Sequence, residues 1–330
     1  IPTYDRLEIL TETLDTLALQ DGFHDADLEI VVSDNASPTD PTPMLRAFEQ
    51  RHGRPLILHR NDSNKGIDGN IHQVADLATG RYILFMSDDD ILLPGTLRKL
   101  QALVRQQPDL LFCFMNGCPF RGRFDPARMA PPIIPLHQDL MTRSKDELIG
   151  TIGVWSTFVS AFFVKRDAWI GVADRTRFIG TDIYLTHVLF RLLAASPQGL
   201  KMATAERLVA ARDNFTGSFR IAHAFGLHFM KLLLEDAPAL GYSPAVMRAV
   251  KRRTLRDTLP SMVLQLRMGA RPRNLGLAEI AVLLRYTWWE AAAWTRMMPM
   301  VLLPRPVLRG LSWMRRRLRG QATPASGAQA

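Results

Sequence analysis

Strand patterns and helix patterns alternate along roughly the first hundred residues of this 330-residue chain. Short apolar runs predict the strands, and apolar residues three or four positions apart predict the helices between them. Because only short connections separate these elements, the pattern predicts an α/β fold built on a doubly wound, mainly parallel sheet. The predicted strands are Leu28–Ser33, Leu56–His59 and Tyr82–Met86, and the predicted helices cover about Arg6–Leu19, a segment with Leu45 and Phe48, Ile71–Ala78 and the residues after Pro94.

An acidic run, Asp88, Asp89 and Asp90, follows closely on the apolar strand Tyr82–Met86. Three adjacent carboxylates repel one another unless a cation, or basic or amide groups, offset their charge. Hard divalent ions take oxygen ligands and commonly share them with substrate phosphates. Open α/β sheets bind their ligands at the edge where the strands end. The run therefore predicts a site for a phosphorylated substrate and Mg²⁺ or Mn²⁺, although a solvated acidic turn or a helix cap is the alternative.

The later part of the chain has a different pattern. We expect residues 1–220 to form the α/β domain, with an elaborated loop region over the site at about Asp109–Pro135 and a further strand at Phe158–Val164. Helical spacing dominates residues 221–330, which predicts a helical appendage. Residues 321–330 are small and polar and are predicted to be disordered.

The N-terminal segment and the two cysteines give information on the cellular compartment. No secretory signal is visible, and the segment that begins at Ile1 has the pattern of a strand whose start is missing, so we expect a truncated N-terminus. Cys113 and Cys118 match no zinc or redox spacing, and we expect them to be plain buried thiols. Such cysteines are consistent with a reducing compartment, and we predict a cytoplasmic location.

Most of the positive charge lies near the C-terminus. The net charge is +9, and Ile280–Ala330 carries eight arginines and one acid. No apolar run reaches the roughly 20 residues that a membrane-spanning helix needs. Mixed basic and apolar residues from Arg305 to Arg319 are typical of segments that lie on a membrane. We therefore predict peripheral attachment to an anionic surface, the inner face of the plasma membrane; a helical domain with a solvated basic end is the alternative.

Several segments of the chain resemble the family 2 glycosyltransferases. The resemblance implies a GT-A fold and a nucleotide-sugar donor. The later segments resemble more narrowly the abequosyltransferase-type enzymes of surface-polysaccharide assembly, which implies a glycan or lipid-linked glycan acceptor. The segments are Ile1–Arg6, Ser33–Ser37, Asn64–Gly66 and Ser87–Asp90 with Pro94 four residues on, and then Gly180–Asp182 and Arg212–Asn214 followed by Gly217 and Ser218.

The same resemblance assigns the donor site. It places the carboxylate of Asp34 on the nucleotide base, and it makes Pro2, Thr3 and Tyr4 the lining of the same pocket. Lys65 would approach the base or the diphosphate. From the residues alone, Asp34 also suits a turn in which its side chain bonds its own backbone, and Lys65 also suits a solvated loop.

For the metal, the resemblance places the binding carboxylate at Asp89 and directs Asp88 toward the ribose or the metal. Ser87 stands where many relatives carry an acid. The outer acid of the usual pair is therefore missing or shifted onto Asp88 and Asp90.

For the acceptor side, the resemblance makes Asp182 the base that deprotonates the incoming hydroxyl, with Asp174 as a weaker rival. An N-cap of the following helix is the simpler role for Asp182. One base, one metal and no second nucleophile predict direct displacement with inversion at the anomeric carbon. The residues predicted to contact the leaving diphosphate or the acceptor are Arg212, Asn214 and Ser218.

Three other functions stay open on the sequence. A sugar nucleotidyltransferase would need a glycine-rich phosphate loop after the first strand, and Pro2–Arg6 has no glycine. A nucleic-acid-binding protein would use the arginines near the C-terminus but would not need the acidic run, so we expect no nucleic-acid partner. A catalytically inert nucleotide-sugar-binding protein stays possible because of Ser87.

Overall fold

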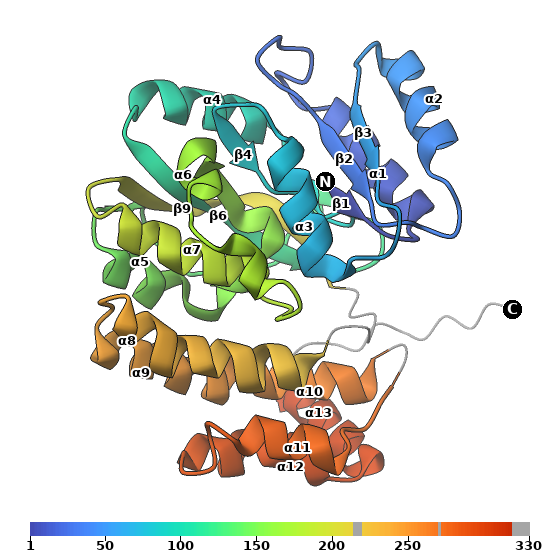
Figure 1. Cartoon of the computed structure of the whole chain (residues 1–330). Helices are drawn as coiled ribbons and strands as arrows, with labels where there is room; N and C mark the ends of the chain where they lie inside the picture. The colour runs from blue at the N-terminus through green and yellow to red at the C-terminus, as the bar shows by residue number, and fades with distance from the viewer. Residues whose placement is uncertain (214–219, 270–271, 319–330) are drawn as a thin grey trace, which may run out of the picture. The chain divides into compact units, whose positions relative to one another are not determined.

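The computed structural model describes residues 1–213, 220–269 and 272–318. The chain divides into two compact units. The first unit consists of residues 1–214 and 228–251, and the second consists of residues 215–227 and 252–330. The helical residues 228–251 thus belong to the same unit as the sheets (Figure 1).

The first sheet is the parallel sheet that the alternating pattern predicts. Its strands β1, β2 and β3 lie in that order, and both neighbouring pairs are parallel. Thr3 pairs with Asp34, and Asp34 pairs with Arg60, so the last residues of the three strands lie at one edge. The strands are β1 Pro2–Thr3, β2 Val31–Asp34 and β3 Ile57–Arg60, and the helices between and after them are α1 Leu7–Ala18, α2 Thr42–His52 and α3 Gly66–Leu77.

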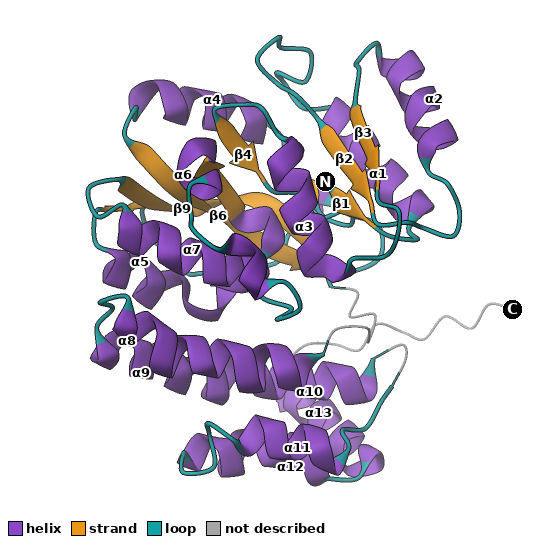
Figure 2. Cartoon of the chain, viewed as in Figure 1, coloured by secondary structure: helices purple, strands orange, loops and turns teal. Residues whose placement is uncertain are grey.

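The second sheet is mixed. Its order is β4-β8-β6-β9-β5, with β7 paired to β9. The long pair β6–β9 is parallel and the other pairs are antiparallel. The α/β class predicted from the sequence is confirmed (Figure 2). The strands are β4 Tyr82–Leu84, β5 Ile91–Leu92, β6 Leu110–Phe120, β7 Leu140–Thr142, β8 Phe162–Lys165 and β9 Leu200–Arg212.

The expectation of an irregular loop region over Asp109–Pro135 is wrong for its first half. Leu110–Phe120 is β6, a strand of 11 residues between β8 and β9. A central strand is buried on both faces, so it lacks the polar–apolar alternation that marks a strand in sequence. Gly117 added to the error, although it serves close packing: a Cβ there would lie 2.9 Å from the carbonyl oxygen of Val209.

The strand expected at Phe158–Val164 is also shorter than predicted. Residues Val159–Ala161 form a 3₁₀ turn, and the strand begins at Phe162. β9, which pairs with β6, was not predicted at all. Both errors concern strands in the interior of a sheet, where neighbours rather than local pattern determine the conformation.

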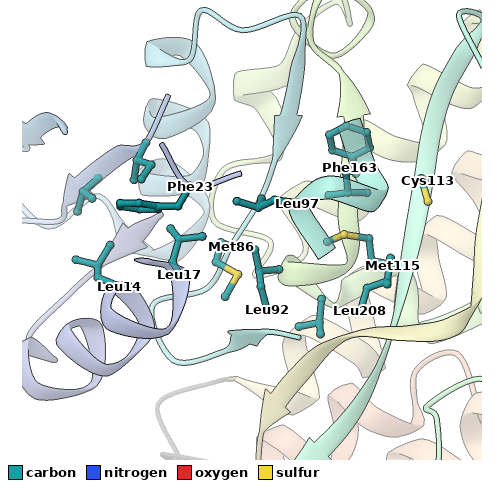
Figure 3. Packing of buried hydrophobic residues seen from close by; sticks show 14 of the residues in the cluster. Leu14, Leu17, Phe23, Met86, Leu92, Leu97, Cys113, Met115, Phe163 and Leu208 are labelled. Carbon is teal, nitrogen blue, oxygen red and sulfur yellow. The ribbon is translucent and has the colours of Figure 1, made fainter. Parts of the chain in front are cut away.

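A large hydrophobic cluster includes residues of both sheets and of their helices. Leu14 of α1 and Met115 of β6 belong to it and are fully buried, and Leu97 of α4 is 5% exposed (Figure 3). Cys113 belongs to the same cluster as a free, buried thiol, as predicted. The remaining helices around the second sheet are α4 Thr96–Gln106, α5 Lys145–Ile152, α6 Arg166–Ile170 and α7 Tyr184–Ala195.

The rest of the chain that the structure describes is helical. Tyr242 connects the helical residues 228–251 to the rest of the first unit, because its hydroxyl donates a 2.8 Å hydrogen bond to the carbonyl of Phe190 in α7. Within the second unit, Nη1 of Arg267 donates to the carbonyls of Met300 and Leu303. No helix in the described ranges is long and apolar enough to cross a membrane. The elements are the π-helical turns Ala222–Phe229, Leu232–Asp236, Thr254–Thr258 and Ala293–Met297, and the helices α8 Ala237–Ala239, α9 Pro244–Arg253, α10 Leu259–Met268, α11 Leu277–Leu284, α12 Met298–Leu302 and α13 Arg305–Leu318.

Candidate active site

Asp34 lies at the carboxyl end of β2 and is only 2% exposed. Its carboxylate accepts hydrogen bonds from the backbone N–H and the hydroxyl of Ser37. Its Oδ2 also lies 3.2 Å from Nη1 of Arg60. The local turn that the sequence offered as an alternative is therefore present, and Arg60 supplies a cation beside the same carboxylate.

A buried amide network at this edge was missed by the sequence analysis. Asn70 of α3 donates to the carbonyls of Ser33 and Thr3, and it accepts from the Ser33 hydroxyl at 2.7 Å. Asn61 donates both to Asn70 and to Asn35. Asn35 in turn accepts from the backbone N–H of Lys65 at 2.9 Å. A signal was available, because Asn70 stands beside Ile71 on the predicted inward face of the helix.

This network positions the loop that carries Lys65. The Lys65 side chain is exposed, and its residue is the N-cap of α3. Of the residues predicted to line the donor pocket, Thr3 is 5% exposed, Pro2 is half-buried and Tyr4 is 42% exposed.

Arg6 provides the charge that offsets the acidic run. Its Nη1 lies 3.1 Å from Oδ1 of Asp88 and 2.9 Å from Oδ2 of Asp89. Thr3 also reaches the run, because its hydroxyl donates to Oδ2 of Asp88 at 2.7 Å. Burial raises the pKa of Asp88 to about 6, although Arg6 acts in the opposite direction. The sequence indicated that a cation, or a basic or amide group, must offset the acidic run, but it did not identify Arg6.

Asp90 has different partners from its two neighbours. Its Oδ2 accepts from the Ser160 hydroxyl at 2.6 Å, and its Oδ1 accepts from the backbone N–H of Arg212 at 2.9 Å. Burial, and then the charge of Asp89, raise the pKa of Asp90 to about 7. This carboxyl therefore joins the acidic run to the segment before β8 and to the end of β9.

The acids differ in their fit to a divalent ion. Asp88 and Asp89 each direct one oxygen to the same nitrogen of Arg6, so two carboxylates converge on one position. Such a pair suits Mg²⁺ or Mn²⁺, which complete their shells with water and substrate phosphates. Within the described residues, no group of three or more acidic, histidine or cysteine side chains is arranged to hold a metal. The ion would therefore take its remaining ligands from water and from the substrate.

Asp182 occupies a turn just before α7. Its φ is +62°, a left-handed conformation that costs a residue with a side chain about 1–2 kcal/mol. Its side chain is half-buried. The expected alternative role as the helix N-cap is wrong, because Ile183 holds that position and makes no side-chain cap bond. The rival acid, Asp174, is exposed and also has a positive φ.

The carboxylate of Asp68 holds this turn. Its Oδ2 accepts from the backbone N–H of Asp182 at 2.7 Å and from that of Gly180 at 2.9 Å. Asp68 lies on α3, two residues before Asn70, and it is 3% exposed. The helix α3 therefore carries contacts both to the edge around Asp34 and to the turn of Asp182.

Arg212 uses its whole side chain in internal contacts. Its Nε donates to the Asp89 carbonyl at 3.0 Å, its Nη2 pairs with Glu12 at 2.7 Å, and its guanidinium lies 4.7 Å from the centre of the Phe120 ring. Arg212 thereby fixes the backbone of the acidic run at Asp89. Asn214 and Ser218, the other two residues predicted on the acceptor side, lie outside the described residues.

A model of glycosyl transferase family 2 matches residues 1–164. This half of the chain belongs to that family. The family-2 half contains the edge around Asp34 and the acidic run, whereas Asp182 lies beyond it. The family predicted from the sequence motifs is confirmed.

Two curated glycosyltransferases are similar to the chain. Abequosyltransferase RfbV of Salmonella typhimurium is 29% identical over 188 residues, which are 55% of this chain and 56% of that protein. A PGL/p-HBAD biosynthesis glycosyltransferase of Mycobacterium tuberculosis is 31% identical over 163 residues, 47% of this chain and 61% of that protein. The chain thus matches little more than half the length of either relative.

The fold is the GT-A type, as predicted. The structure of Staphylococcus aureus TarS 1–349 in complex with UDP-GlcNAc matches with a TM-score of 0.59 at 16% identity, covering 98% of this chain and 91% of that one. A mannosyltransferase from Pyrobaculum calidifontis in complex with GDP-Man and Mn²⁺ matches with a TM-score of 0.53 at 16% identity, covering 97% and 86%.

Proposed function

We propose that the protein is an inverting glycosyltransferase. It transfers a sugar from a nucleotide-sugar donor to a hydroxyl of a glycan acceptor in the synthesis of a cell-surface polysaccharide. The observation that carries the proposal is the link between the two halves of the donor site: Thr3 of β1 and Arg6 both bond to the acidic run after β4. This link brings a nucleotide-binding edge and a pair of convergent carboxylates together on a family-2 fold.

The donor nucleotide lies at the edge formed by β1 and β2. Asp34 accepts from the base, and Pro2, Thr3 and Tyr4 line its pocket, because all of them lie at or just beyond the carboxyl ends of these strands. The Lys65 side chain is exposed beside this edge and reaches toward the diphosphate. The binding of UDP-GlcNAc by the similar TarS fold supports a nucleotide-sugar donor.

Asp88 and Asp89 would hold the divalent ion, and Asp90 anchors the run to the rest of the sheet. The Mn²⁺ complex of the similar mannosyltransferase fold supports a metal. A bound Mg²⁺ or Mn²⁺ supplies Lewis-acid stabilisation of the leaving diphosphate. Arg6 bonds to the same oxygens that would take the ion, so its guanidinium would compete with the ion for them.

Asp182 is the general base. It takes the proton from the acceptor hydroxyl while that oxygen attacks the anomeric carbon, a contribution typically worth about 10²–10⁴-fold in rate. With one base and no second nucleophile among the motif residues, the reaction is a single displacement and the anomeric configuration inverts.

The second unit provides attachment to the membrane that carries a lipid-linked acceptor. Val307, Leu311 and Met314 of α13 are exposed at intervals of four and three residues and form one apolar stripe. Leu308, about 100° away around the helix, is 1% exposed. Arg305 and Arg309 lie on the same helix, and a cation near an anionic lipid surface is worth about 1 kcal/mol. We place the protein at the inner face of the plasma membrane as a peripheral protein.

The test is transfer to a hydroxyl acceptor by the full chain with a panel of nucleotide sugars and Mn²⁺. We expect transfer with one donor, an inverted product by NMR, and loss of more than 99% of transfer in Asp182→Asn with unchanged affinity for the nucleoside diphosphate. Asp174→Asn is the matched control and retains activity. Retention of configuration, or normal turnover by Asp182→Asn, contradicts the mechanism; binding of nucleotide without any transfer identifies an inert binding protein.

A further inference from the structure

One face of α3 contacts the segment that leads to Asp182. Asp68, His72 and Asp76 follow one another at intervals of four residues along this face. His72 Nδ1 lies 2.9 Å from the Tyr184 hydroxyl, and Asp76 pairs with Arg175 at 2.9 Å. Asp68 and His72 bring the helix and the segment together, whereas the Asp76–Arg175 pair lies at the exposed end of this face, where a surface ion pair contributes little.

Asp68 makes the contacts that fix the turn itself. Besides the N–H groups of Gly180 and Asp182, it accepts from the N–H of Tyr184 at 3.3 Å, the first residue of α7. One carboxylate therefore satisfies three backbone donors within five residues. An amide replaces it only in part, because an asparagine has one acceptor oxygen and its NH₂ group would face either the N–H of Tyr184 or those of Gly180 and Asp182.

The same turn of α3 holds the donor edge. Asn70, two residues after Asp68, bonds to the backbone of Thr3 and Ser33. One turn of α3 therefore bonds to the donor edge through Asn70 and to the turn of Asp182 through Asp68. This turn sets the position of Asp182 relative to the donor. Burial raises the pKa of Asp68, and the charge of Asp182 raises it further, whereas the three N–H groups lower it.

We propose that Asp68 is a positioning residue: through the N–H groups of Gly180 and Asp182 it holds Asp182 in the left-handed conformation that directs the base at the acceptor hydroxyl. The proposal rests on the role of Asp182 given above. It assigns to Asp68 an effect on the rate of transfer and none on donor binding.

The first test compares Asp68→Asn with Asp76→Asn, the same chemical change on the same helix at an exposed position. We expect Asp68→Asn to lower kcat at least tenfold, with the KM for the donor and the Kd of UDP or GDP within twofold of the original. Asp76→Asn stays within twofold in all three. In the Asp182→Asn background, Asp68→Asn has no further effect on the residual rate, because the positioned group is already gone.

A second measurement does not depend on activity. Hydrogen exchange of the peptide spanning residues 178–186 is at least tenfold faster in Asp68→Asn and unchanged in Asp76→Asn. Gly180→Ala perturbs the turn without altering α3, because Gly180 has a φ of +94° and a Cβ there meets no atom within 4 Å. It lowers kcat in the same way, which keeps the proposal testable if Asp68→Asn fails to fold.

The outcomes separate this inference from the proposed function. Unchanged exchange, normal kcat or a raised donor KM in a folded Asp68→Asn protein overturns the inference while the glycosyltransferase proposal stands. If Asp182→Asn transfers sugar normally, the base assignment is wrong, and the inference falls with it. If exchange is faster but the double variant loses rate additively, Asp68 acts on something other than Asp182 and the inference is overturned.

Discussion

The hydroxyl of Thr3 donates a 2.7 Å hydrogen bond to the carboxylate of Asp88, which lies 85 positions later in the chain. Both residues are buried. The bond joins the first sheet to the end of β4 at the point where the proposed donor lies. Its loss should therefore affect both stability and donor binding.

We expect Thr3→Val, which preserves shape and removes the hydroxyl, to lower the free energy of unfolding by about 1–3 kcal/mol, because a buried carboxyl loses a donor. Urea unfolding measures the effect. Thr11→Val is the control: the Thr11 hydroxyl bonds only to Leu7 within α1, and we expect a change below about 1 kcal/mol. Equal losses in the two variants would show that the bond across the sheets has no special value.

Asp89→Asn tests the metal assignment. We expect Mn²⁺ to raise the affinity of the original protein for the correct nucleoside diphosphate. This increase in affinity should be at least tenfold smaller in the variant, because one of the two convergent carboxylates is gone. Titration calorimetry with UDP and GDP, with and without Mn²⁺, measures it. Asp62→Asn, in an exposed loop, is the control. A Mn²⁺ effect that survives in Asp89→Asn places the ion elsewhere.

His187 predicts a pH dependence of stability. It is 3% exposed, stacks on Phe178 at 4.7 Å, and neither ring nitrogen has a partner among the described residues. Burial lowers its pKa to about 3; Asp236 opposes this, and the charges of Arg191, His228 and Lys231 add to it.

The unfolded chain therefore binds a proton between about pH 6.5 and pH 3 that the folded protein excludes, and stability falls as the pH falls through this window. The loss from this group is about 2 kcal/mol at pH 5 relative to pH 8. We expect His187→Leu to remove that part of the pH dependence in urea unfolding, whereas His24→Leu, at an exposed site, leaves it in place. Parallel pH profiles for the original protein and His187→Leu would contradict the assignment.

The apolar stripe of α13 predicts membrane binding. Leu311→Ser combined with Met314→Ser should abolish flotation with phosphatidylglycerol vesicles, because both side chains are exposed on the stripe and would insert between lipids. Leu19→Ser, at a site 85% exposed in the first unit, is the control. Flotation of the double variant at the original level, or equal binding to neutral vesicles, would refute electrostatic attachment through this helix.

Local pattern predicted the first sheet and the order of its helices. Each of those helices buries one side, and each of those strands is a short run that ends at a turn. The spacing of the apolar residues therefore reveals both kinds of element. The same pattern did not reveal β6 and β9, because strands buried on both faces show no alternation. Gly117 in β6 even indicated a loop.

The sequence by itself determined which chemical groups stand at the ends of the strands: Asp34 as the last residue of β2 and the acidic run after β4, in an order typical of family 2. Only the tertiary structure decided their partners. Arg6 reaches Asp88 across 82 positions, and Asp68 reaches Asp182 across 114. Contacts at such separations arise when packed elements bring distant residues together, and a periodicity that spans ten or twenty residues carries no record of them.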